Sequence, residues 1–235
     1  THHPSSAASD VYKRQLVMPS EFDSFYTDLS DTSHRTASVM FHIRFSTNTS
    51  PKWHLAQPYR VIAHNGEINT ISGNRNWALA RMNNLSSKRF GNMRKYQPLV
   101  NQSGSDSSSL DNMIEVLKEG GVNIGRAARM LIPPSWQNTD LMDSDEKAFH
   151  EYNSMHMEAW DGPALICFQD KNFLSCFLDR NGLRPAKIEF FNDETVCISS
   201  EFGSNNDNLK TIKTERLGTG GLFVNDRNSQ KILKD

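Results

Sequence analysis

Residues 61–69 read VIAHNGEIN. The apolar run VIA is followed by the polar group HNGE at residues 64–67, and the apolar Ile68 comes directly after that group. An apolar run that ends in Asn-Gly is typical of a strand entering a turn. Polar groups gathered at the end of a strand are also typical of ligand sites, because loops on a rigid scaffold carry many binding residues. The stretch therefore allows two interpretations, a hairpin turn or a site that holds a ligand.

The segments before this stretch carry further signals. Residues 38–45, SVMFHIRF, alternate apolar and polar side chains throughout, which predicts a strand with His42 and Arg44 on its polar face. Residues 59–63 predict a second strand that ends at His-Asn-Gly. Farther upstream, residues 21–29 suggest a short helix.

Helical patterns fill the middle of the chain. The apolar residues at 110, 113, 114 and 117 fall at i, i+3, i+4 and i+7, which is the spacing of one helix face. Ser107 or Ser108 is the expected N-cap of this helix, and the Gly-Gly pair at 120–121 is its expected end. Three further helices are expected over residues 72–85, 124–131 and 144–155.

After the sequence WDGP at 160–163, the chain changes to short apolar or β-branched runs separated by turn residues. Runs at 164–168, 173–178, 186–191 and 195–199 predict an antiparallel meander, with Asn-Gly at 181–182 as a hairpin signal. Residues 221–225 and 230–233 suggest one more hairpin. Strands, then helices, then strands again predict an α+β fold.

The composition excludes several classes of protein. The chain has 235 residues, a formal net charge of -1, and 37% hydrophobic residues, so we expect a globular protein that binds neither nucleic acid nor membranes. Cys167, Cys176 and Cys197 lack the spacing of metal ligands, and no metal site is expected. Their apolar neighbours predict buried thiols of a reducing compartment; a reactive thiol is the alternative.

Residues 1–15, THHPSSAASDVYKRQ, do not share the pattern of the remaining chain. They are polar, rich in Ser and Ala, and lack the apolar stretch of a secretory signal. Residues 10–15 can be back-translated into a sequence that resembles a transposon-end adapter. We therefore expect residues 1–15 to be a sequencing or cloning artefact, with the authentic chain starting near Leu16.

A series of motifs, in order along residues 21–235, resembles the class II glutamine amidotransferase domain found in the large chain of glutamate synthase. The motifs are RFSTN at 44–48, Trp53, AQP at 56–58, AHNGEINT at 63–70, GN at 73–74, SDS at 105–107, LD at 110–111, WDGP at 160–163 and LDRNGLRP at 178–185. The resemblance implies that residues 16–235 form part of this domain. It also implies a four-layer αββα sandwich of the N-terminal nucleophile hydrolase type, here incomplete at the N-terminus.

The resemblance implies a reaction and a set of site residues. The family hydrolyses the side-chain amide of L-glutamine, using an N-terminal Cys as nucleophile and its α-amino group as base. Asn65 and Gly66 correspond to the oxyanion hole, where a side-chain N–H and a backbone N–H steady the developing negative charge. Arg44 corresponds to the clamp on the glutamine α-carboxylate, and Asp106 to the acceptor of the α-ammonium.

Several assignments stay open at this point. His64 is a general base or a structural histidine, and Glu67 is a positioning or tunnel-side residue. The segment at 179–185 either helps join this domain to the rest of the enzyme or forms a plain hairpin. No cysteine precedes Cys167, and Thr1 heads the suspected artefact, so we expect the nucleophile to be absent and this fragment to be inactive.

The partners and cofactors follow from the same resemblance. L-Glutamine is the expected ligand, and the synthase domains of the intact chain are the expected partners. No cofactor is expected in this fragment, whereas FMN and an iron–sulfur cluster are implied for the intact enzyme, which passes ammonia to 2-oxoglutarate. The expected location is the cytoplasm, or the plastid of a plant or alga. The alternative is a non-catalytic glutamine-binding or scaffold protein that has lost its nucleophile.

Overall fold

The computed structural model describes residues 17–33, 35–44, 50, 52–140, 142–201, 209–229 and 231–234. Its α-helices are α2 (Phe22–Phe25), α3 (Ile71–Met82), α4 (Asp106–Glu119), α5 (Ile124–Leu131) and α6 (Ser144–Ser154). Its strands are β1 (Ile62–Gly66), β2 (Ala164–Gln169), β3 (Phe173–Leu178), β4 (Lys187–Phe191), β5 (Val196–Ser199), β6 (Thr211–Arg216), β7 (Leu222–Asp226) and β8 (Lys231–Lys234). Short 3₁₀ segments lie at Pro19–Glu21, Thr27–Ser30, Trp53–Leu55 and Met93–Tyr96.

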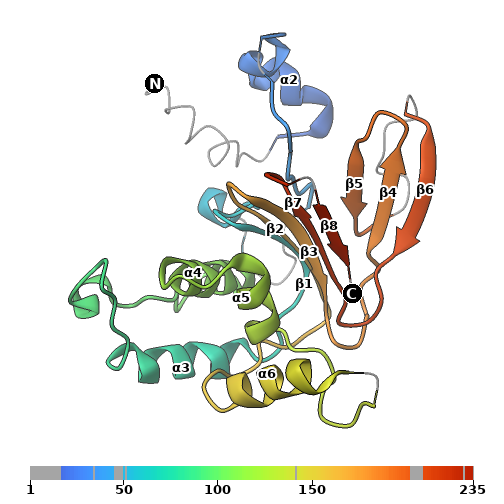
Figure 1. The fold of residues 1–235 in the computed structure, drawn as a ribbon. Helices are drawn as coiled ribbons and strands as arrows, with labels where there is room; N and C mark the ends of the chain where they lie inside the picture. Colours follow the sequence, from blue (N-terminus) through green and yellow to red (C-terminus); the bar gives the residue numbers. More distant parts are fainter. Residues whose placement is uncertain are drawn as a thin grey trace.

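The strands form two antiparallel sheets (Figure 1). The larger sheet has the strand order β1-β2-β3-β7-β8, and the smaller sheet has the order β5-β4-β6. Strand β1 pairs with β2 on one side and is the edge of the larger sheet. The His-Asn-Gly group therefore lies on an edge strand.

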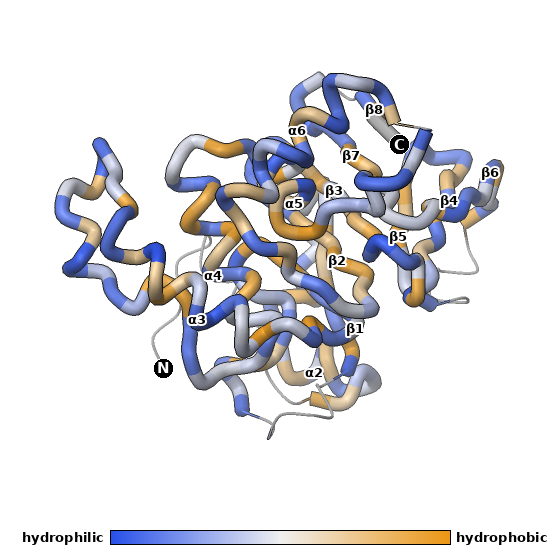
Figure 2. The backbone as a smooth tube through the Cα atoms, turned by 90° about the horizontal axis from the view of Figure 1, so that it is seen from below, coloured by the Kyte–Doolittle hydropathy of each residue, from blue (hydrophilic) through white to orange (hydrophobic). Residues whose placement is uncertain are grey.

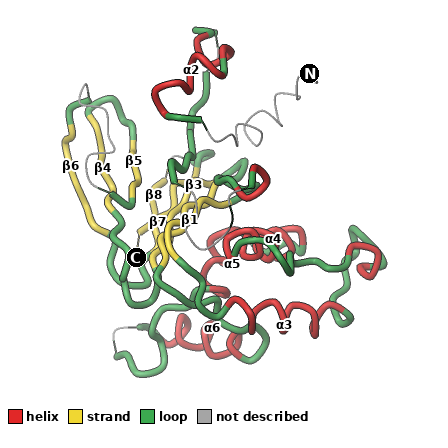
Figure 3. The backbone as a smooth tube through the Cα atoms, turned by 180° about the vertical axis from the view of Figure 1, so that it is seen from behind, coloured by secondary structure: helices red, strands yellow, loops and turns green. Residues whose placement is uncertain are grey.

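Helices α3 to α6 lie on one side of the larger sheet, with α4 and α5 packed against it and α3 and α6 beside them (Figures 1 and 3). Ile62 and Ile166 of the sheet and Leu110 and Ile114 of α4 are completely buried in the core between these layers. Figure 2 shows hydrophobic stretches of the tube gathered in this interior and hydrophilic turns around it. Burial of this apolar surface holds the helices on the sheet.

The other face of the larger sheet packs on the smaller sheet. Cys176 and Phe223 from the larger sheet are fully buried against Ile188 and Leu217 from the region of the smaller one. The layers are therefore helices, larger sheet and smaller sheet. The predicted α+β class is confirmed, and the described residues supply three layers of the expected αββα sandwich.

The predicted helices are confirmed with small shifts of their ends. The N-cap of α4 is Ser105, whose Oγ accepts the Ser108 N–H at 3.1 Å, so the prediction of Ser107 or Ser108 was wrong by two or three positions. The helix ends at Gly120 as expected. The expected helix at 21–29 is instead α2 between two 3₁₀ segments.

The predicted meander is only partly correct. The hairpins β2–β3, β4–β5 and β7–β8 are confirmed, but β3 pairs with β7, and β4 belongs to the other sheet. Asp179 explains the missing β3–β4 hairpin, because its buried carboxylate accepts the N–H groups of Ala164, Asn181 and Leu183 at 3.0, 3.0 and 3.3 Å. Residues 179–185 thus carry the chain from one sheet to the other, and the hairpin interpretation was wrong.

The predicted strand at 38–45 was also wrong for its described part, 38–44, which forms no strand, while Phe45 lies outside the described residues. A strand needs a neighbour to pair with, but side chains already occupy the nearby edge of β1. Gln57 bonds both backbone groups of His64, and the Asp111 carboxylate accepts the Ile62 N–H at 3.1 Å. The side chains of Val39, Phe41 and Ile43 are consequently exposed.

Two further predictions have different outcomes. The strand expected at 59–63 is observed as β1 three residues later, so it contains His-Asn-Gly rather than ending before it. The expectation for residues 1–15 lies outside the described residues. No helix in the described part of the chain is long and apolar enough to cross a membrane.

Candidate active site at the end of β1

The register between β1 and β2 determines which backbone groups of β1 are directed outward. The Glu67 N–H donates to Pro163 O at 3.0 Å, and the Gln169 N–H donates to Val61 O at 2.9 Å. Because bonded and non-bonded pairs alternate in an antiparallel ladder, the odd-numbered residues of β1 bond to β2. The even-numbered residues therefore direct their N–H and C=O groups away from β2.

His64 and Gly66 are the even-numbered residues at the site. The His64 N–H donates to Gln57 Oε1 at 2.6 Å, and the His64 C=O accepts from Gln57 Nε2 at 3.0 Å. The amide of Gln57 thus takes the place of a neighbouring strand at this position. The Gly66 N–H is the next outward group, and the alternation directs it to the open edge of the sheet.

Gly66 and Gly162 interlock at this edge. Gly66 has φ +146, and a Cβ added to it would lie 1.8 Å from Pro163 O. Gly162 has φ +157, and its Cβ would lie 1.8 Å from Glu67 O. The HNG and WDGP motifs therefore pack backbone against backbone, an approach that only glycine permits.

Asn65 presents its side chain on the opposite face from the helices. Its Nδ2 donates to Ser200 Oγ at 2.8 Å, which connects β1 to the segment that follows β5 in the smaller sheet. An amide nitrogen has two N–H donors, and the contact with Ser200 uses one of them within the described part of the chain. Asn65 and the outward Gly66 N–H thus lie next to each other at the end of β1.

Arg44 lies near the same segment. Its side chain is 74% exposed, and its Nη1 is 3.9 Å from Glu201 Oε1. Ser200 and Glu201 therefore bring Arg44 and Asn65 to one place from distant parts of the sequence. An exposed ion pair at this distance is weak, and a carboxylate ligand could replace Glu201 as the partner of the guanidinium.

Asp106 is the first residue of α4 and bonds to the turn that follows Gly66. Its Oδ2 accepts the Ile68 N–H at 2.7 Å, and its Oδ1 accepts the Ser107 N–H at 2.7 Å. A carboxylate can accept about four hydrogen bonds, so capacity for an ammonium group remains. The structure thus ties Asp106 to the turn that follows Gly66, a link that sequence alone did not reveal.

His64 is buried on the helix side of β1, with 2% of its surface exposed. Its Nδ1 lies 2.7 Å from Ser107 Oγ. Burial lowers the pKa of His64 to about 4, although the nearby Asp106 carboxylate opposes that change. The ring is neutral at neutral pH and enclosed, which favours the structural interpretation of His64. Glu67 is exposed, and its predicted positioning role stays a prediction.

Four residues of this arrangement were missed as site residues from the sequence: Gln57, Ser107, Ser200 and Glu201. Gln57 and Ser107 lie within the AQP and SDS motifs, so those motifs were an available signal. Ser200 and Glu201 carry no local pattern. Only the pairing of the two sheets places them at β1.

The three cysteines do not belong to the site. All are free, and the thiols of Cys167 and Cys176 have pKa values raised by burial, that of Cys167 to about 12. Cys176 is buried as predicted, whereas Cys167 and Cys197 are partly exposed. Among the described residues, no group of three or more His, Cys, Asp or Glu could hold a metal ion. These residues do not fit an iron–sulfur cluster, which needs several ionised thiolates together.

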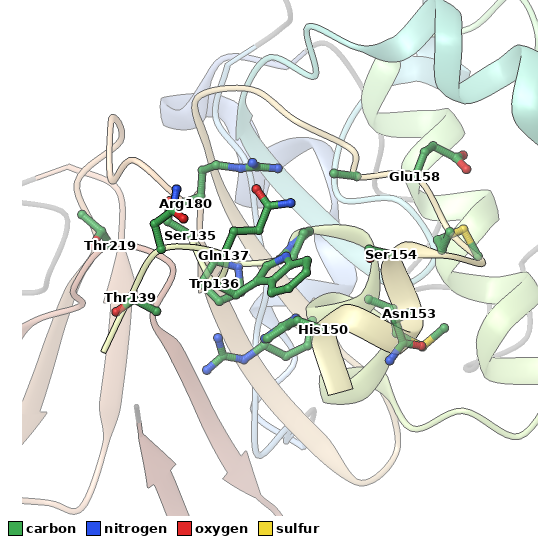
Figure 4. Close-up of a pocket in the computed structure, with 17 residues that line it drawn as sticks. Ser135, Trp136, Gln137, Thr139, His150, Asn153, Ser154, Glu158, Arg180 and Thr219 are labelled. Atoms are coloured by element: carbon green, nitrogen blue, oxygen red, sulfur yellow. The ribbon is translucent and has the colours of Figure 1, made fainter. Parts of the chain in front are cut away.

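A cavity of about 600 Å³ lies elsewhere, beside α6 and the loop that follows α5 (Figure 4). Its lining includes Arg129, Trp136, His150, Asn153, Glu158 and Arg180. Figure 4 shows the Trp136 indole lying over the His150 ring, with centroids 6.4 Å apart. None of Arg44, Asn65, Gly66 and Asp106 lines this cavity, so the candidate site is the open edge of β1.

Comparisons with known proteins place the chain in a family. It is 41% identical over 232 residues to the glutamate synthase [NADPH] large chain of Bacillus subtilis. That alignment covers 98% of this chain and 15% of the Bacillus subtilis protein. It is 40% identical over 233 residues to the ferredoxin-dependent glutamate synthase of Antithamnion sp., covering 97% of this chain and 15% of that protein. The chain therefore spans a small part of the length of these relatives.

A solved structure and a family model were also matched. The glutamine phosphoribosylpyrophosphate amidotransferase of B. subtilis aligns with a TM-score of 0.47 and 15% identity over 83% of this chain and 33% of that one. The model for glutamine amidotransferases of class II matches residues 3–235. The chain belongs to the class II glutamine amidotransferase family.

Proposed function

We propose that this chain is part of the glutaminase domain of a glutamate synthase. In that role the intact enzyme hydrolyses the side-chain amide of L-glutamine to glutamate and ammonia, and passes the ammonia to 2-oxoglutarate. The observation that carries the proposal is the outward Gly66 N–H beside Asn65 at the end of β1, adjoining Asp106. Relatives at about 40% identity over nearly the whole chain support the synthase as the parent enzyme.

Asn65 and Gly66 stabilise the oxyanion in this proposal. Attack on the amide carbon converts its carbonyl oxygen into an anion, which accepts hydrogen bonds from Asn65 Nδ2 and the Gly66 backbone. Removing one such donor typically slows a reaction about 100- to 1,000-fold. The interlock with Gly162 supports this role, because it holds the Gly66 backbone in one position.

Arg44 and Asp106 hold the two charged ends of the substrate. The planar guanidinium of Arg44 can take the α-carboxylate through two parallel hydrogen bonds, displacing the weak pair with Glu201. Asp106 accepts the α-ammonium while it continues to hold the Ile68 N–H. This arrangement selects an α-amino acid whose side chain points to Asn65 and Gly66.

The printed sequence has no cysteine before Cys167, and Cys167, Cys176 and Cys197 lie in β2, β3 and β5. Raised pKa values make the Cys167 and Cys176 thiols poor nucleophiles. We therefore propose that the polypeptide of this sequence binds L-glutamine but does not hydrolyse it. FMN and an iron–sulfur cluster, which supply electrons in the synthase, belong to other parts of the intact enzyme.

Calorimetric titration of the 235-residue chain with L-glutamine tests the proposal. We expect saturable binding of L-glutamine but not of D-glutamine, and no release of ammonia. Asp106→Asn should weaken binding about 10- to 100-fold, because a charged hydrogen bond contributes about 1.5–3 kcal/mol. Asp145→Asn, at the exposed start of α6, is the matched control that keeps affinity. Equal affinity in the Asp106 and Asp145 variants would overturn the site assignment.

The full reading frame that contains this sequence distinguishes the enzyme from the scaffold alternative. Ammonia release from L-glutamine by that longer protein supports the glutaminase role. Binding of L-glutamine without any ammonia release would instead support a protein that has lost its nucleophile.

A further inference from the structure

One hydrogen-bonded chain connects the two sides of the Asn65-Gly66 turn to α4. On the C-terminal side of the turn, the Asp106 carboxylate accepts the Ile68 N–H directly at 2.7 Å. On the N-terminal side, Ser107 Oγ lies 2.7 Å from His64 Nδ1. Ser107 Oγ also donates to Asp106 Oδ1 at 3.2 Å. A single carboxylate is therefore linked to both flanks of the proposed oxyanion donors, directly to Ile68 and through Ser107 to the His64 side chain.

The direction of these bonds defines the tautomer of His64. A serine hydroxyl has one proton, and Ser107 gives it to the Asp106 carboxylate, which can only accept. With its own proton directed to Asp106, Ser107 is then the acceptor in the contact with His64, and the proton of the ring lies on Nδ1. His64 Nε2 is left as the unprotonated nitrogen, and this atom is buried without a hydrogen-bond partner among the described residues.

We infer that Ser107 is a positioning residue that couples the ammonium-binding carboxylate Asp106 to the oxyanion donors at Asn65 and Gly66 through His64. Its hydroxyl contacts His64 and Asp106. It holds the ring of His64, while the Gln57 amide bonds to the His64 backbone. Together these contacts hold the next two residues, Asn65 and Gly66, in one orientation at the end of β1. The inference rests on the proposed function for its catalytic consequence, and on the observed contacts for its structural one.

The catalytic consequence is a loss of rate rather than of substrate affinity. Ser107→Ala removes the hydroxyl between His64 and Asp106 but leaves the Asp106 carboxylate and Arg44 in place. Misplacement of donors by a fraction of an ångström to one ångström costs up to about 100-fold in rate. In the full reading frame, Ser107→Ala should therefore lower kcat by about 10- to 100-fold with little change in KM for L-glutamine.

Nitrogen NMR of the 235-residue chain with ¹⁵N-labelled histidine tests the structural part without any catalysis. At neutral pH we expect His64 with a protonated Nδ1 and an unprotonated Nε2. Ser107→Ala should release that preference and shift the Gly66 amide signal, whereas Ser107→Thr, which keeps the hydroxyl, should restore both. Ser109→Ala is the matched control, because Ser109 is also buried in α4 but its hydroxyl bonds to Asn101 O and Arg75 Nε and not to His64.

The possible results distinguish the inference about Ser107 from the proposed glutaminase function. A His64 ring protonated at Nε2 in the unaltered chain would overturn the inference, even if Ser107→Ala failed to fold. Unchanged His64 and Gly66 signals in a folded Ser107→Ala chain would overturn it as well. Absence of glutaminase activity in the unaltered full reading frame would count against the proposed function, and the NMR result would still decide the role of Ser107.

Discussion

The carboxylate of Asp106, at the first position of α4, accepts the backbone N–H of Ile68 at 2.7 Å, two residues beyond Gly66. A helix N-terminus and a strand end are thereby fixed to each other. The bond to a charged acceptor is stronger than a neutral one. The geometry of the proposed site thus depends on a contact between residues 38 positions apart.

Asp106→Ala should destabilise the fold by about 2–3 kcal/mol, because it leaves the N–H groups of Ile68 and Ser107 without their acceptor. Urea unfolding measures the change. Asp145→Asn in the first turn of α6 removes only an exposed acidic group near a helix N-terminus and should cost less than about 1 kcal/mol. Equal losses in the two variants would show that the Ile68 contact contributes nothing.

Gly66→Ala should destabilise the chain by at least about 3 kcal/mol, because φ +146 disfavours an L side chain and the new Cβ would collide with Pro163 O. Gly73→Ala is the matched control: Gly73 lies in α3, and a Cβ there meets no atom within 4 Å. That control should stabilise the chain by about 0.5–1 kcal/mol. Thermal unfolding of both variants checks the opposite signs.

Acid should weaken the fold through its buried histidines. Burial lowers the pKa of His64 and of His150 from 6.5 to about 4, so between these values the unfolded chain binds protons that the folded chain does not. Their contribution to stability is therefore complete above pH 6.5 and is lost as the pH falls through 4. His64→Gln should flatten the stability profile in this window, and the same substitution at the exposed His54 is the control. A profile for His64→Gln as steep as that of the unaltered chain would contradict the account.

Asp179→Ala should cost about 3 kcal/mol or more, because three backbone N–H groups would lose a buried acceptor at the crossing between the sheets. The exposed Asp193 in the β4–β5 turn accepts the Thr195 N–H at 3.0 Å, and Asp193→Ala should cost about 1 kcal/mol. Urea unfolding compares the two variants. Similar values for both would mean that the crossing does not depend on Asp179.

The sequence predicts those elements whose signal is local. The helix α4 has an apolar stripe and a glycine stop within its own residues, and α5 matches its predicted range of 124–131. The residues of β6, Thr211–Arg216, are almost all exposed, so no apolar alternation marks that strand. The alternation at 38–45 is real, but a strand also needs a pairing partner, which a local pattern cannot supply.

The candidate site was likewise predictable from the sequence only in part. The resemblance of the motifs indicated Arg44, Asn65, Gly66 and Asp106, and their roles stay predictions. Contacts between distant residues could not be predicted from the sequence. One example is the hydrogen bond from Asn65 to Ser200, which are 135 positions apart. The contact between Ser107 and His64 likewise depends on how α4 packs on β1. No residue pattern within either element encodes that packing.

Ammonia release from L-glutamine by the full reading frame, compared with its Asn65→Ala variant, tests the central claim most directly. The account predicts release by the unaltered protein and a rate about 100- to 1,000-fold lower in the variant. Asn84→Ala, at an exposed position after α3, is the control that should keep the rate. Equal rates in the unaltered protein and the Asn65→Ala variant would contradict the assignment of the end of β1 as the oxyanion site.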